Sequence, residues 1–196
     1  MWGGRRIYLK ISTPLHASFP FMSENIVERP SELPWYAVRT FNCLEQKVSR
    51  FLEEKAISHF IPMTFAGEER KILVPAIHNL LFIQKPDTET GIIKTLSECP
   101  FPVSIFRYPG DRGLCEISER DMIELRMLCD PQYKTTVFMT QGEAEATLGK
   151  DVRVINGPFK GSVGRLVRKN KQYYFLKIVI GIGVMVRVSR WYCEPI

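Results

Sequence analysis

A short segment near the C-terminus constrains the fold of this chain most, because it specifies a strand, a turn and a second strand. Residues 151–167 have the sequence Asp-Val-Arg-Val-Ile-Asn-Gly-Pro-Phe-Lys-Gly-Ser-Val-Gly-Arg-Leu-Val. Val152 and Val154 alternate with polar residues, which is typical of a strand with one buried face. The pair Asn156-Gly157 tolerates the positive φ angles of a tight turn, and Pro158 has a fixed φ and no N–H to lose.

Two glycines follow this turn, and the surrounding sequence favours strands throughout. Gly161 and Gly164 interrupt the return strand, where we expect a bulge or a close approach of another backbone. Further on, residues 173–180 and 184–188 are rich in β-branched and aromatic residues. We therefore predict a small closed β-barrel over residues 150–196 that stays in the β form. The turn resembles the KOW motif of transcription elongation factors and ribosomal proteins, and its residues are Asn156, Gly157, Pro158, Phe159, Lys160, Gly161 and Gly164.

The positive charge of the chain is concentrated in this predicted barrel. From Lys150 to the C-terminus there are ten Lys and Arg residues and two Asp and Glu residues, in a chain whose formal net charge is +6. A small basic domain suggests contact with nucleic acid or with an acidic protein surface. Solvation of a small domain by Lys and Arg would account for the same composition.

The preceding part of the chain alternates between strand and helix patterns. Residues 35–41 are rich in strand-forming residues, and Asn42 with Glu45 three positions later has the spacing of a helix capping box. Ser118 and Asp121 have the same spacing before another amphipathic segment. The predicted order β-α-β-β-α-β-α indicates an α+β domain of split βαβ type, with helices on one face of an antiparallel sheet.

The composition divides the chain into four parts. Residues 31–130 carry the α+β pattern, and residues 131–149 lose periodicity, which predicts a linker of ordinary inter-domain length. Residues 1–30 show no periodicity, so we expect a disordered tail or a misassigned start ahead of Met22. The four predicted segments are 1–30, 31–130, 131–149 and 150–196.

The residue types that carry catalysis or bind metals are not arranged as such sites require. The five cysteines lack CxxC spacing, and His16, His59 and His78 lack metal-ligand spacing. No fingerprint of a hydrolase, a phosphate-binding loop or a dinucleotide fold is found. No apolar run reaches the length of a membrane span. We therefore predict a cytoplasmic, monomeric, non-enzymatic binding protein with no catalytic residues, no metal, no cofactor and no membrane contact.

The ordered combination of segments resembles the NusG family of transcription elongation factors, over residues 34–196. The strand Trp35-Tyr36-Ala37-Val38, the segment 60–63, the strand Leu80-Leu81-Phe82-Ile83 and the KOW motif carry the resemblance. Within the family, the chain looks most like the specialised antiterminators of the RfaH and UpxY groups.

The resemblance implies partners and binding residues. The N-terminal domain would bind the clamp helices of the largest RNA polymerase subunit and bridge toward the far side of the DNA channel, which suppresses pausing. Binding to the clamp helices requires an apolar patch on the domain that receives the tip of a helix. Since strand residues alternate between faces, at most half of any run can form the patch, and core packing is the competing role. The candidates are Trp35, Tyr36, Leu80, Phe82 and Phe106.

The specialised members of the family also contact exposed non-template DNA, for which Arg39, Arg70 and Lys71 are candidates. Ordinary surface charge is the competing role of these three residues. The KOW domain of the family docks a termination factor or a small-subunit ribosomal protein. Two features depart from the family pattern: His78-Asn79-Leu80 stands where Pro-Gly-Tyr or Pro-Asn-Tyr is usual, and the hairpin between the second and third strands is short.

These observations predict an antitermination or elongation factor that acts on elongating RNA polymerase at particular operons, such as those for polysaccharide biosynthesis. Two alternatives stay open at this point. One is a ribosome- or RNA-binding KOW protein in which the basic barrel carries the activity. The other is the general housekeeping NusG factor.

Overall fold

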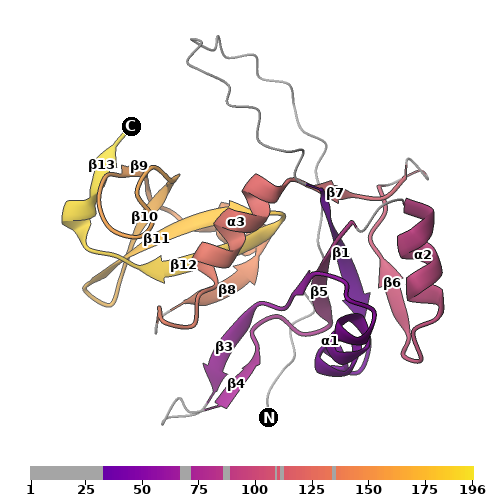
Figure 1. The fold of residues 1–196 in the computed structure, drawn as a ribbon. Coiled ribbons are helices and arrows are strands. Elements are labelled where there is room, and N and C mark those ends of the chain that lie inside the picture. The colour runs from indigo at the N-terminus through magenta and orange to yellow at the C-terminus, as the bar shows by residue number, and fades with distance from the viewer. Residues whose placement is uncertain (1–32, 67–71, 86–88, 109, 111–112, 134–135) are drawn as a thin grey trace.

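Two antiparallel sheets and a separate two-stranded ribbon make up the fold (Figure 1). The computed structural model describes residues 33–66, 72–85, 89–108, 110, 113–133 and 136–196. A five-stranded sheet lies in the N-terminal half of the chain and a six-stranded sheet in the C-terminal half. The expectation for residues 1–30 concerns a segment outside the described residues.

The N-terminal sheet has the strand order β2-β5-β1-β6, and β7 pairs with the first part of β1. All of its pairings are antiparallel, and Ala37 lies opposite Phe82 in the central pair. This arrangement confirms an antiparallel sheet in a mixed α/β domain. The strands are β1 (Trp35–Thr40), β2 (His59–Phe60), β5 (Leu80–Gln84), β6 (Val103–Ile105) and β7 (Glu116–Ile117).

Helices cover both faces of this sheet, whereas the sequence pattern predicted helices on one face. The helices α1 (Glu45–Glu54) and α2 (Glu89–Ser97) pack on the face that carries Tyr36, through residues such as Val48 and Ile92. The helix α3 (Glu119–Leu128) packs on the other face. The prediction was wrong here because both sides of β1 and β5 are apolar, so both faces exclude water.

The two predicted helix caps had different outcomes. At α3, the Ser118 hydroxyl accepts a hydrogen bond from the backbone N–H of Asp121 at 3.1 Å, as its spacing predicted. At α1, the capping box at Asn42 was wrong, because the helix begins at Glu45 and Asn42 has a positive φ of 55°. The Glu45 carboxylate instead accepts the backbone N–H of Asn79, from the turn that precedes β5.

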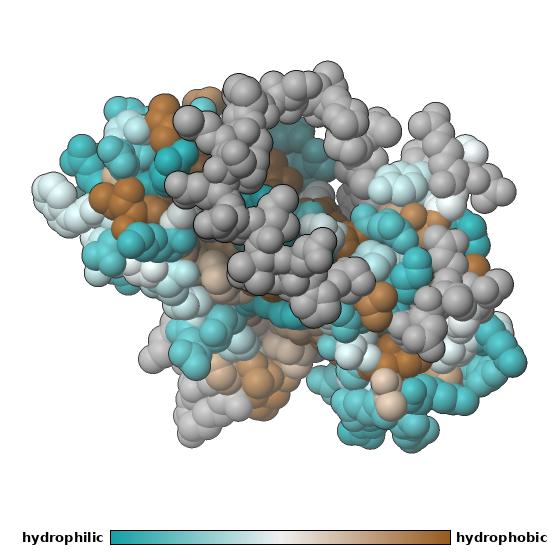
Figure 2. Space-filling model, turned by 45° about the horizontal axis from the view of Figure 1, so that its top comes forward, coloured by the Kyte–Doolittle hydropathy of each residue, from teal (hydrophilic) through white to brown (hydrophobic). Residues whose placement is uncertain are grey.

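A β-hairpin extends away from the N-terminal sheet (Figure 1). It consists of β3 (Met63–Ala66) and β4 (Ile72–Pro75). Three large apolar side chains, those of Phe65, Ile72 and Leu73, are exposed on it. Figure 2 shows the resulting hydrophobic surface at the bottom of the molecule, beside atoms drawn in grey. The β3–β4 hairpin is thus an apolar projection. Exposed apolar surface of this kind usually marks a site of contact with a partner.

The C-terminal sheet has the strand order β13-β9-β10-β11-β12-β8. It is antiparallel throughout, and a short helix, α4 (Gln141–Ala146), packs against it. Among the described residues no pairing joins β13 to β8, so the sheet is not closed by hydrogen bonds as predicted for a barrel. The strands are β8 (Val137–Thr140), β9 (Lys150–Val154), β10 (Val163–Lys169), β11 (Gln172–Val179), β12 (Ile182–Arg187) and β13 (Cys193–Pro195).

The segment predicted as a linker is structured over much of its length. In it, β8 pairs with β12, and Thr140 caps α4 in a reciprocal capping box with Glu143. Residues 137–140 therefore form a strand of the C-terminal sheet, and residues 141–146 form a helix that packs against it, where a linker was predicted. The role was missed because β8 is a short edge strand and the polar helix α4 buries a single alanine, Ala144.

The described part of the chain contains no helix long and apolar enough to cross a membrane. Apolar side chains instead gather in three buried clusters. The largest cluster contains residues from both sheets and from α3, so the two halves of the chain share one core.

The return strand of the KOW-like motif provides a stability test. A Cβ atom added at Gly164 would lie 2.6 Å from the carbonyl oxygen of Leu176 and 2.7 Å from the ring of Phe175. We expect Gly164→Ala to lower the free energy of unfolding by about 1–3 kcal/mol, because a backbone atom must move. Urea denaturation of the full chain measures the effect.

The matched control is Gly142→Ala, since Gly142 lies in α4 with no atom within 4 Å of its added Cβ. Replacing this helical glycine should leave stability unchanged or raise it by about 0.5–1 kcal/mol. Equal destabilisation by the two substitutions would contradict the close approach at Gly164.

Candidate functional site

One face of the N-terminal sheet collects three of the five predicted polymerase-binding residues. Trp35 lies on β1, and Leu80 and Phe82 lie on the neighbouring strand β5, where the antiparallel register places all three on the same face. Their side chains are 3%, 4% and 0% exposed. Phe106, just after β6, is half-buried and packs against the same cluster. We call Trp35, Leu80, Phe82 and Phe106 the α3-side face.

Tyr36 lies apart from this group. It is fully buried on the opposite face of the sheet, in the cluster beneath α1 and α2. Its hydroxyl donates a hydrogen bond to Glu116 Oε1 at 3.0 Å. The alternation of strand residues therefore separates Tyr36 from Trp35, and one docking surface cannot use both without major rearrangement.

The helix α3 covers the α3-side face with both apolar and polar contacts. Met122 and Leu125 are buried in the same cluster as Trp35. The Trp35 indole N–H donates a hydrogen bond to the Glu119 carboxylate. Arg126 lies over the Trp35 ring, with its guanidinium carbon 4.3 Å from the ring centroid, and also donates to Glu119 at 3.2 Å. A charged pair at the rim thus fixes the orientation of the indole.

The C-terminal sheet closes over the other side of α3 (Figure 1). Phe159 and Phe175 belong to the same apolar cluster as the α3-side face, and the Phe159 ring lies 4.9 Å from that of Tyr133. Two polar contacts join the halves at Glu124, whose carboxylate accepts hydrogen bonds from Lys177 and from the Ser162 hydroxyl. The α3-side face is therefore covered in this conformation, and its polymerase-binding role stays a prediction.

The predicted nucleic-acid-binding residues are only partly described. Arg39 lies on β1, half-buried, with its guanidinium carbon 5.9 Å from the centroid of the Phe41 ring. Phe41 is exposed, so a cation and an aromatic face lie together at the end of β1, as base stacking requires. Arg70 and Lys71 lie outside the described residues. The DNA-binding role of all three residues stays a prediction.

The residues of the KOW-like motif form a turn that is anchored in the core. Phe159 is buried between Tyr133 and Phe175, while Pro158 and Lys160 are exposed. The turn is longer than a two-residue hairpin, because β9 ends at Val154 and β10 begins at Val163. Positive φ angles occur at the two glycines of the turn, 83° at Gly157 and 92° at Gly161.

The motif is also held by short hydrogen bonds. The Gly157 N–H donates to its neighbour Asn156 Oδ1 at 2.7 Å, and the Gly161 N–H donates to the carbonyl of Val154 at 2.7 Å. These contacts give Asn156 and Gly161 structural roles and leave Lys160 as the exposed cation of the turn.

Most of the cations of the C-terminal sheet are accessible to a partner. Arg165 is an exception, because it donates a hydrogen bond to the carbonyl of Thr147 at 2.6 Å and so connects the end of α4 to β10. Another cation with an internal partner is Lys177, which bonds to Glu124. The exposed Lys and Arg residues of this sheet are Lys150, Arg153, Lys160, Arg168, Lys169, Lys171, Arg187 and Arg190.

Comparison with known proteins finds a family that the N-terminal half resembles. The family model described as Transcription termination factor nusG matches residues 33–126, from just before β1 to within α3. This match shows that residues 33–126 are similar to a family of transcription factors. The α3-side face lies within the segment that resembles the NusG family. No curated protein sequence matches the chain.

The contact between α3 and the C-terminal sheet can be tested by charge reversal. The side chains of Glu124 and Lys177 are 21% and 22% exposed, so their pair is partly shielded from water. We expect Lys177→Glu to lower the free energy of unfolding by about 1–3 kcal/mol, because it places two carboxylates together. The double variant with Glu124→Lys should recover most of this loss, as measured by urea denaturation.

A second ion pair serves as the control. Lys55 and Glu98 lie 2.8 Å apart, but their side chains are 44% and 46% exposed, so Lys55→Glu should destabilise the protein clearly less than Lys177→Glu. If Lys177→Glu costs no more than Lys55→Glu, or if the double variant shows no recovery, the Glu124–Lys177 contact does not persist in solution.

Proposed function

We propose that the protein is a transcription antitermination factor that binds elongating RNA polymerase and suppresses pausing or termination at particular operons. The NusG-family match over residues 33–126, together with the apolar α3-side face within that segment, carries this proposal. The face combines one tryptophan with leucine and phenylalanine side chains, the residue types that dominate buried protein interfaces. Its partner would be the clamp helices of the largest polymerase subunit.

The burial of this face defines a step that must precede polymerase binding. A helical tip can contact Trp35 and Phe82 only after α3 and the C-terminal sheet have moved away from them. The polymerase would then replace apolar contacts that the protein makes with itself. We call the arrangement in which α3 and the C-terminal sheet cover the face the closed state. The larger the fraction of molecules in the closed state, the lower the apparent affinity of the protein for polymerase, so weakening the closed state should raise that affinity.

The β3–β4 hairpin suits the second contact of such a factor. It projects from the domain, and Phe65, Ile72 and Leu73 are exposed on it. Arg70 and Lys71 occupy the connection between its two strands in the sequence. We propose that the hairpin reaches toward the opposite side of the DNA channel, with Arg39, Arg70 and Lys71 as the candidates for contact with non-template DNA.

The C-terminal sheet would dock a further component of gene expression. Trp191 is 83% exposed, and the single 3₁₀ turn η1 (Arg190–Tyr192) that carries it lies between β12 and β13. An exposed tryptophan beside basic residues fits a protein surface such as that of a small-subunit ribosomal protein or a termination factor. The exposed cations also support the alternative of an RNA- or ribosome-binding protein.

Polymerase binding through the α3-side face can be tested at a half-buried position. We expect Phe106→Ala in the full-length protein to weaken binding to purified core RNA polymerase about fivefold or more, since truncating an interface aromatic costs over 1 kcal/mol. Biolayer interferometry with immobilised polymerase measures the affinity. Phe101→Ala is the matched control, because Phe101 is also half-buried but packs on the α1 side of the sheet.

The same binding assay tests whether the closed state competes with polymerase binding. Lys177→Glu should strengthen polymerase binding, whereas the charge-swapped double variant should return toward the wild-type affinity. Equal binding by the Phe106 and Phe101 variants would argue against the α3-side face. Absence of polymerase binding together with retention of ribosomal RNA would support the RNA-binding alternative.

The specialised role is decided by the genome-wide effect of deleting the gene. We expect run-on sequencing to show loss of transcription toward the distal end of one or a few operons, because the chain departs from the family pattern at His78-Asn79-Leu80. A change across most transcription units would instead identify the general housekeeping factor. Complementation by the intact gene controls for indirect effects.

A further inference from the structure

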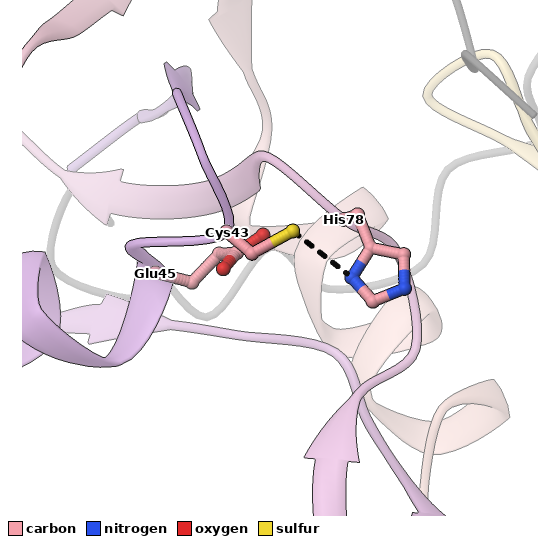
Figure 3. Close-up of side chains that lie close together, drawn as sticks. All are labelled: Cys43, Glu45 and His78. Atoms are coloured by element: carbon pink, nitrogen blue, oxygen red, sulfur yellow. Dashed lines mark hydrogen bonds between the residues drawn. The ribbon is translucent and has the colours of Figure 1, made fainter. Parts of the chain in front are cut away.

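Two turns that are distant in the sequence bring three metal-ligating side chains together. Cys43 lies in the turn between β1 and α1, Glu45 is the first residue of α1, and His78 lies in the turn before β5 (Figure 3). The Cys43 sulfur, a Glu45 carboxylate oxygen and a ring nitrogen of His78 all lie within 4.8 Å of one another. The Cys43 Sγ and His78 Nδ1 atoms are 3.8 Å apart.

The Glu45 carboxylate is the strongest indication that a ligand belongs at this cluster. The residue is fully buried, and Oε1 accepts the backbone N–H of Asn79. Oε2 is also buried and has no hydrogen-bond partner among the described residues. Burying a carboxylate oxygen without a partner is unfavourable, and a bound cation would remove this penalty.

We propose that Cys43, Glu45 and His78 form a binding site for a thiophilic divalent cation, with Zn²⁺ as the best match. Thiolate, imidazole and carboxylate together are a donor set that zinc accepts. In a tetrahedral zinc site, the usual metal–sulfur and metal–nitrogen distances place the two donor atoms about 3.6 Å apart. The observed separation of 3.8 Å is therefore close to that of a liganded pair.

The exposure of the ligands determines the kind of site. Cys43 and His78 are exposed, while Glu45 lies at the bottom of the cluster. A cation can thus enter from solvent, and three protein ligands leave the fourth position to water. Such a site is open, in contrast to the closed four-ligand sites of zinc fingers.

The surrounding backbone holds the ligands in place before a metal binds. Asn79 is central, because its side-chain Oδ1 accepts the Cys43 N–H at 2.9 Å while its own N–H donates to Glu45. Asn42, Cys43 and Asn79 all have positive φ angles, of 55°, 55° and 61°. For Cys43 this conformation is uncommon in a residue with a Cβ atom, and it directs the sulfur toward His78 (Figure 3).

The buried cysteines of the chain differ from Cys43. Burial raises the pKa of the Cys129 thiol to about 12, so this residue stays protonated near neutral pH. Cys115 is buried as well, and burial raises its pKa. Since the thiolate is the form that binds a metal, these two cysteines are unsuited to the role.

Cobalt provides a direct test, because a thiolate bound to Co²⁺ gives an intense charge-transfer absorption. Full-length, reduced, untagged protein is titrated with Co²⁺ and then with Zn²⁺. We expect a near-ultraviolet charge-transfer band that saturates at one equivalent and is lost when Zn²⁺ displaces Co²⁺. Zn²⁺ should also raise the melting temperature, because it binds the folded state.

The variants assign the band to its residues. Cys43→Ser should abolish the band and the rise in melting temperature, and His78→Asn should weaken Co²⁺ binding tenfold or more. Cys99→Ser is the matched control and should behave as the wild type, since Cys99 lies outside the cluster. His78 is exposed, so its variant tests the site even if Cys43→Ser fails to fold.

Three results would overturn the proposal: no charge-transfer band in the wild-type protein at excess Co²⁺, a band that survives both Cys43→Ser and His78→Asn, or a band lost in Cys99→Ser. The outcome is independent of polymerase binding, because each readout reports on the metal alone.

Discussion

The strands β1 and β5 are apolar on both faces of their sheet, and this is the constraint on which the rest of the structure depends. Both strands carry large apolar residues at successive positions, so both faces of the sheet must be covered. The helices α1 and α2 cover one face, and α3 together with the C-terminal sheet covers the other. Each buried Trp, Phe or Leu side chain contributes about 1.5–3 kcal/mol, whereas a partly exposed ion pair contributes about 1 kcal/mol or less. Apolar burial therefore holds the halves together, and Glu124 with Lys177 fixes their orientation.

This arrangement places stability and the proposed function in competition. The side chains best suited to receive a polymerase helix are those that stabilise the contact between the two halves. Under the proposed function, the polymerase would replace the apolar contacts that α3 and the C-terminal sheet make with this face. Because the same apolar face would be covered in both states, changes at the contact between the two halves would shift the balance between them.

Much of the local structure could be predicted from the sequence. Alternation and turn chemistry, which involve only neighbouring residues, predict the strands β1, β5 and β9. They also predict the helix cap at Ser118 and the glycine-dependent turn before β10. The predictions that were wrong involve partners far away in the chain. The Glu45 carboxylate accepts a hydrogen bond from the Asn79 backbone, where a capping box with Asn42 was predicted. Residues 137–140 pair with β12, where a linker was predicted. Local spacing contains no information about either partner.

The sequence by itself determined the α+β domain, the basic all-β C-terminal unit and the resemblance to NusG factors, because each depends on short-range patterns. Only the tertiary structure decided which residues of those patterns meet. It separated Tyr36 from Trp35 by the alternation of β1, and it buried the α3-side face under α3 and the C-terminal sheet. It also brought Cys43 and Glu45 to His78, more than thirty residues away. Clusters of this kind arise from the register of strands and the positions of turns, which long-range packing sets.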